Sequence, residues 1–153
     1  MKYQAIGVCL AVSLVSACGG GAGSSTTAPP PSYPSVAGNW TGMLIGASPD
    51  ASAAVRLTIE QTSDIILGSL QRIHGLWTGT IGSQQVGGNF NGGLATDGRM
   101  QFTLVLSGGG SCNFSMDVRA QGNRTEGTFG TVGPVGCAPT SVSPAGRVEL
   151  TRE

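Results

Sequence analysis

Short stretches in which apolar and polar residues alternate dominate the chain from Val36 onward, and glycine-rich segments separate them. The clearest stretches place these apolar residues on one face: Val55, Leu57 and Ile59; Met100, Phe102, Leu104 and Leu106; Cys112, Phe114, Met116 and Val118. A period of two puts alternate side chains on opposite faces of a β-strand, whereas a helical period of 3.6 would scatter them. The sequence therefore predicts strands with one buried face.

Weaker strands are predicted at residues 38–45, 65–70, 76–81, 85–92, 125–131 and 147–151, which gives eight or nine strands. Residues that favour turns lie between strands: Ser48-Pro49-Asp50, Gly87-Gly88, Thr96-Asp97-Gly98, Gly108-Gly109-Gly110 and Gly122-Asn123. Short connections imply that consecutive strands are antiparallel neighbours. We therefore expect an all-β fold, an antiparallel up-and-down meander of about eight strands. Closure into a small β-barrel would remove both exposed edges, and a two-sheet β-sandwich is the alternative.

Composition agrees with a small β domain and excludes some partners. Among 153 residues there are 26 glycines, 10% charged residues and 5% aromatic residues, which argues against a helical bundle. Eight basic residues balance eight acidic ones along the chain. Without a basic patch, nucleic acid is not an expected partner.

The N-terminus has the organisation of an export signal. Lys2 supplies a positive charge, and an apolar run follows from Ala5 to Val15. This run is too short for a membrane-spanning helix, which needs about twenty residues, so we expect its removal.

The segment Val15-Ser16-Ala17-Cys18 resembles the lipobox of bacterial lipoproteins. The resemblance implies cleavage before Cys18 and attachment of lipid, with acyl chains such as palmitate, to its sulfur. Gly19, rather than Asp, follows the cysteine, which in Gram-negative lipoproteins is compatible with sorting to the outer membrane. The expected location is therefore the bacterial cell envelope, in contact with the periplasm, with the chain lipid-anchored at the outer membrane. The alternative is an ordinary signal peptide cut after Ala17.

Three segments are expected. Residues 1–17 form the lipoprotein signal peptide, residues 18–35 carry the lipidated cysteine and a flexible Gly/Ser/Pro tether, and residues 36–153 form the β-barrel domain.

The first and last predicted strands contain recognisable residues. Gly38-Asn39-Trp40 forms a GxW-like start, and the last strand, from Gly146 to Arg152, contains late arginines. Together these ends resemble those of calycin-type barrels, the lipocalin and avidin families. The resemblance implies a Trp at one end of the barrel with Arg147 or Arg152 stacked on it. The chain also resembles small uncharacterised bacterial lipoproteins with a GxWxG opening, here Gly38 to Gly42, and a final Leu-Thr-Arg. That likeness implies no particular activity.

The sequence offers few catalytic parts. His74 is the only histidine and is expected in a loop or at a strand end, and the carboxylates fall at turns or on outward faces. No phosphate-binding loop or CxxC motif is present. We therefore expect no enzyme, and no cofactor or metal.

Two functions remain open. In the first, the barrel binds a small apolar ligand among Trp40, Trp77, Phe90, Phe102, Phe114 and Met116. These residues could equally well fill the core without a ligand. In the second, the domain is a protein-interaction module, an inhibitor or accessory subunit of an envelope complex. An internal cavity would favour the first function, and a filled barrel with an exposed apolar patch would favour the second.

Cys112 and Cys137 are the two cysteines of the predicted domain, and in an exported chain they are expected to form a disulfide. Closing a loop of about 25 residues should stabilise the domain by about 3 kcal/mol. We predict that the Cys112→Ser/Cys137→Ser variant loses about this amount of unfolding free energy in urea titrations. Reductant should lower the stability of the wild type toward that of the variant and leave the variant unchanged. An equal effect of reductant on both would contradict the disulfide.

Overall fold

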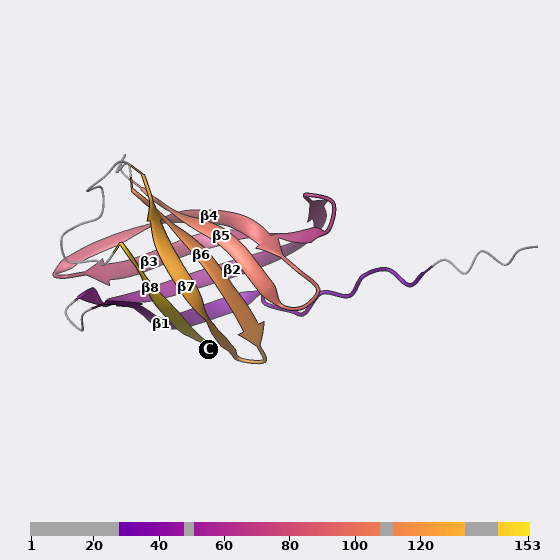
Figure 1. Ribbon diagram of the computed structural model, residues 1–153, viewed down its shortest axis with the longest axis horizontal. Helices are drawn as coiled ribbons and strands as arrows, with labels where there is room; N and C mark the ends of the chain where they lie inside the picture. The colour runs from indigo at the N-terminus through magenta and orange to yellow at the C-terminus, as the bar shows by residue number, and fades with distance from the viewer. Residues whose placement is uncertain (1–27, 48–50, 108–111, 134–143) are drawn as a thin grey trace, which may run out of the picture. The chain divides into compact units, whose positions relative to one another are not determined.

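The computed structural model describes residues 28–47, 51–107, 112–133 and 144–153 of the chain. Its compact unit, Pro31–Glu153, is an all-β barrel, and the strands follow one another around it in chain order. Figure 1 shows this arrangement. The strands are β1 (Gly38–Gly46), β2 (Ala53–Ile66), β3 (Leu70–Ile81), β4 (Gln84–Leu94), β5 (Arg99–Leu106), β6 (Asn113–Gln121), β7 (Arg124–Val132) and β8 (Ala145–Arg152).

The predicted antiparallel meander of eight strands is confirmed, and the barrel is closed. Closure is made by β1, which pairs with β2 on one side and with β8 on the other. Thr41, for example, lies opposite both Arg56 and Thr151. The alternative, a two-sheet sandwich, is therefore wrong.

The strand predicted at residues 65–70 is not a separate strand. Its residues form the end of a long hairpin between β2 and β3, and Ser69 N donates a hydrogen bond to Ile66 O at 3.3 Å. Leu67 and Gly68 have φ angles of 49° and 78°, the signs found in a type I′ turn. The number of strands is therefore eight rather than nine.

The turn predicted at Gly87-Gly88 is also wrong, because both glycines lie inside β4. The turn between β3 and β4 occurs earlier, at Gly82, where φ is 61°. A Cβ atom at Gly88 would lie 1.8 Å from Val105 O, so the glycine lets two backbones approach closely. The turns predicted at Thr96-Asp97-Gly98 and Gly122-Asn123 are confirmed, whereas 48–50 and 108–110 lie outside the described residues.

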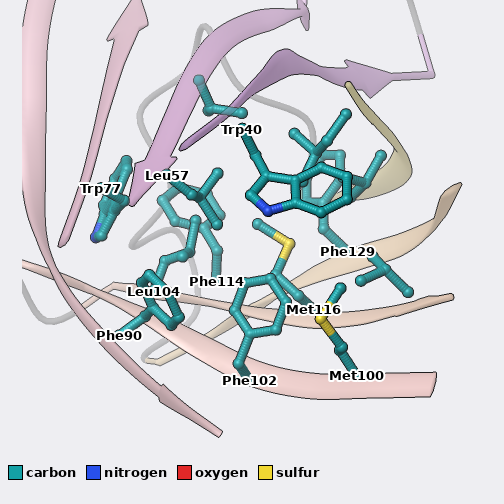
Figure 2. Packing of buried hydrophobic residues seen from close by; sticks show 14 of the residues in the cluster. Trp40, Leu57, Trp77, Phe90, Met100, Phe102, Leu104, Phe114, Met116 and Phe129 are labelled. Carbon is teal, nitrogen blue, oxygen red and sulfur yellow. The ribbon is translucent and has the colours of Figure 1, made fainter. Parts of the chain in front are cut away.

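The inward side chains of all eight strands form one hydrophobic core. Figure 2 shows how its large side chains lie against one another. Phe114 makes edge-to-face contacts with Trp77 and with Phe129, at ring-centroid distances of 6.2 and 6.4 Å. Burial of these aromatic side chains is a major source of stability in a chain with so few of them.

One end of the barrel is closed around Trp40. Its indole Nε1 donates a hydrogen bond to Val36 O at 2.8 Å. The guanidinium of Arg152 lies 5.8 Å from the Trp40 ring centroid and donates hydrogen bonds to Ser35 O and Ala37 O. Of the two arginines predicted for this position, Arg152 therefore occupies it. Arg147 instead pairs with Glu149 on the outer surface, at 2.9 Å.

We predict that Arg152→Met lowers the free energy of unfolding by about 1–3 kcal/mol, because the substitution removes the carbonyl contacts and the cation over the indole. Arg147→Met is the matched control and should cost less than about 1 kcal/mol, because its ion pair is exposed. Urea titrations of both variants test this difference. Equal losses would mean that the contact with Trp40 contributes nothing specific.

Candidate functional site

The six residues predicted to face the barrel interior are all buried. Trp40, Trp77, Phe90, Phe102, Phe114 and Met116 are at most 4% exposed and belong to one hydrophobic cluster. Phe90 and Phe102, for example, lie with their ring centroids 5.2 Å apart. The side chains that would have lined a ligand site therefore pack against one another.

A hollow of about 340 Å³ lies on the outer surface of β1, β2 and β3. The outward side chains of Asn39, Arg56, Thr58, Leu76 and Thr78 line it. A second hollow, of about 240 Å³, also includes Arg56 and Thr78, and reaches Thr41. We call the surface formed by Asn39, Thr41, Arg56, Thr58, Leu76 and Thr78 the β1–β3 face.

Strand register explains why these side chains gather. Asn39 lies opposite Thr58, which in turn lies opposite Leu76, so the three form a row across the strands. Thr58 Oγ1 donates a hydrogen bond to Asn39 Oδ1 at 3.0 Å. Thr41, Arg56 and Thr78 form the next row. Short polar side chains thus surround Leu76.

Leu76 is the apolar centre of the β1–β3 face. Its side chain is 66% exposed, although it lies in the middle of a strand. Arg56 lies in the neighbouring row, and its guanidinium is 3.6 Å from Glu153 Oε1. The face therefore combines an exposed aliphatic group, hydroxyl and amide groups, and an ion pair. Such a surface can contact a macromolecule, but it lacks a nucleophile with an adjacent base.

The sequence did not predict the β1–β3 face, because the alternating pattern marks each of its residues only as an outward residue of a strand. The available signal was Leu76, an apolar residue two positions before the outward Thr78 and therefore on the same face of the strand. Alternation alone does not show that the neighbouring strands place short polar residues around it.

His74, the sole histidine of the sequence, lies within β3 and not at its end or in a loop as predicted. It faces outward, with Nε2 3.5 Å from Glu60 Oε2 on β2. Within residues 28–47, 51–107, 112–133 and 144–153, no cluster of three or more His, Cys, Asp or Glu could hold a metal ion. His74 and Glu60 are thus a cross-strand pair on the barrel surface.

Four charged residues form a ladder on the outer surface where β5 and β6 adjoin. Arg99 Nε donates to Asp117 Oδ1 at 2.8 Å, and Arg119 pairs with Asp97. The guanidinium of Arg99 lowers the pKa of Asp117, and the same contact raises the pKa of Arg99. The pKa of Asp97 is lowered first by the Arg99 backbone N–H and then by Arg119. The ladder is an exposed ion-pair network.

The lipidation and disulfide predictions fall largely outside the described residues. Cys18 and Cys137 both lie there, and Cys112, just before β6, is buried at 2% exposure. In the part of the chain that the structure describes, no helix has the length and apolar character to cross a membrane.

No protein-family model, curated protein or solved structure matches this chain.

We predict that Asp117→Asn lowers the stability at neutral pH by less than about 1 kcal/mol, because the ion pair is exposed. The pKa of Asp117 is lowered by folding, so its contribution is present above the ordinary value of 3.8 and is lost as pH falls below it. The stability difference between wild type and variant should therefore shrink in acid. Urea titrations from pH 7 to pH 2 measure it, and Arg99→Gln in a double-mutant cycle isolates the pair. A difference independent of pH would contradict this assignment.

Proposed function

We propose that this protein is a lipid-anchored lipoprotein of the bacterial cell envelope whose barrel head is a protein-interaction module. Lipid on Cys18 would hold the head at the membrane, and the head would bind another envelope protein as an inhibitor or accessory subunit. The head would carry out no chemical reaction of its own.

The packed barrel interior carries this proposal. The aromatic and methionine side chains that a ligand would contact are at most 4% exposed and touch one another. An apolar ligand would have to displace these contacts, and close-packed cores resist such displacement. Recognition through the outer surface requires no change in the core.

Closure of the barrel restricts how a partner can bind. Because β1 and β8 pair with each other, neither offers a free edge for strand addition. A partner that binds where β1 meets β8 must therefore contact outward side chains. The β1–β3 face suits a loop or extended segment that places an apolar side chain against Leu76 and polar groups against Thr58 and Thr78.

Photo-crosslinking in living bacteria tests this assignment. A photo-reactive amino acid at position 76 should give one discrete adduct, whereas the same group at position 105 should give none. Val105 is the matched control, because it also faces outward from a strand and is 37% exposed. Thr58→Arg should abolish the adduct at position 76 without changing the melting temperature, because the larger charged side chain would fill the hollow.

The same strains test the anchor by metabolic labelling with a fatty acid. The wild type should incorporate label, and Cys18→Ala should not. Adducts of equal intensity at positions 76 and 105, or no adduct at either, would contradict the β1–β3 face as the binding surface. A small apolar molecule that remains bound in the purified head would instead indicate a ligand carrier.

A further inference from the structure

The tip of the β2–β3 hairpin is an exposed aliphatic surface. Leu67 is 88% exposed and Ile65 is 49% exposed, and Ile66 and Leu70 are half-buried beside them. β1 pairs with β2 only as far as Ile59, and β4 pairs with β3 only as far as Gln71, so the residues at the tip lie beyond both neighbouring strands. Most of the aliphatic surface of this tip therefore faces solvent, at a cost in free energy.

The backbone conformation of Leu67 is also unfavourable. Its φ of 49° lies in the left-handed region, where a Leu costs about 1–2 kcal/mol and Asn or Gly is preferred. Turn formation does not explain a leucine here, since Asn-Gly would form the same turn with less strain. A residue that is both strained and exposed indicates a function at that position.

The segment that leads to Cys18 reaches the barrel beside this tip. Tyr33 Oη donates a hydrogen bond to Ser69 O at 2.8 Å, and Gln61 Nε2 donates to Pro34 O at 3.1 Å. Residues of this segment and of the tip line a shared hollow of about 390 Å³. Its lining includes Pro31, Tyr33, Ile65 and Leu70. Figure 1 shows the hairpin and the start of the barrel unit at the same end of the barrel.

Tyr33 is the fifteenth residue after Cys18, so even a fully extended chain between them spans only about 50 Å. A lipid on Cys18 would therefore keep the tip close to the bilayer at a high effective concentration. The charged residues of the hairpin between Gln61 and Ile73 are Asp64 and Arg72. Arg72 Nε lies 3.8 Å from Asp64 Oδ2, so the two charges form an ion pair with no net charge. Their neutrality removes an electrostatic barrier to contact with lipid headgroups.

We infer that the β2–β3 tip inserts Leu67 and its aliphatic neighbours into the interfacial region of the membrane that holds the lipid anchor. This inference rests on the proposed anchor at Cys18. The lipid holds the chain to the bilayer, and the tip fixes which end of the barrel faces it. Insertion depends on apolar burial and should not depend on salt or on anionic lipids.

Fluorescence quenching in vesicles tests the inference. The lipidated full chain, carrying Ser69→Cys or Ser83→Cys labelled with an environment-sensitive dye, is reconstituted into phosphatidylcholine vesicles with nitroxide-bearing acyl chains. Ser83 is the matched control, because it is exposed in the β3–β4 turn at the opposite end of the barrel. We expect quenching at position 69 and none at position 83.

Leu67→Asn, combined with the label at position 69, separates a membrane role from a structural one. The ratio of inserted to withdrawn tips should fall about tenfold or more, because burial of one Leu side chain is lost. The melting temperature should stay equal or rise, because Asn adopts the left-handed conformation more readily. A lower melting temperature, or unchanged quenching, would assign Leu67 to the fold and overturn the inference.

Flotation of the same vesicles distinguishes the two possible failures. If the wild-type chain floats but the dye at position 69 is not quenched, the anchor holds and the inserted tip is wrong. If the chain does not float, both the anchor and the tip are wrong. Equal quenching at positions 69 and 83 would also overturn the inference, since the head would have no preferred orientation.

Discussion

Pairing between β1 and β8 is the contact on which the rest of the barrel depends. It needs two glycines, since a Cβ atom at Gly42 would lie 1.9 Å from Glu149 O, and one at Gly146 would lie 2.1 Å from Ile45 O. Once these backbones meet, every strand has two neighbours and the inward side chains of opposite walls come together. Arg152, near the end of β8, then reaches Trp40 and covers the end of the core. Closure, core packing and the covered end are thus consequences of one strand pairing.

The closed and packed barrel determines where recognition can occur. Pairing of β1 with β8 leaves no free sheet edge between the first and last strands, and the inward side chains fill the core. Outward side chains and turns therefore remain for binding. Among the residues that the structure describes, Leu76 and Leu67 are the most exposed large hydrophobic side chains, and they lie on the β1–β3 face and the β2–β3 tip, respectively. They differ in their surroundings, because Leu76 lies among hydroxyl groups, whereas Leu67 lies beside the segment that leads to Cys18. This difference is why we assign a protein partner to the first and lipid to the second.

Strand alternation predicted much of the fold because the barrel has one buried face. The apolar residues of β5 and β6 identified both strands, and the short connections predicted that consecutive strands are antiparallel neighbours. Gly87 and Gly88 were misread as a turn because glycine serves both turns and close backbone approach, and only the register shows which applies. The β1–β3 face escaped prediction because Thr58 and Leu76 are 18 residues apart in sequence and become neighbours only through strand pairing. The choice of Arg152 over Arg147 likewise depends on strand register, since Arg152 lies opposite Trp40 whereas Arg147 lies opposite Ile45, farther along β1.

The parity of the strand number has a topological consequence. In an up-and-down barrel with an even number of strands, the first strand begins and the last strand ends at the same rim, and here Glu153 N donates a hydrogen bond to Asn39 O. The last residues of β1, β3, β5 and β7 lie at the other rim. A short linker could therefore join Glu153 to the start of the barrel unit for circular permutation, and a permuted barrel opened at Gly82-Ser83 would have both new termini at the rim opposite Tyr33. In such a molecule, a tether joined to the new N-terminus would meet the barrel at the rim opposite Tyr33, and every strand pair would be kept.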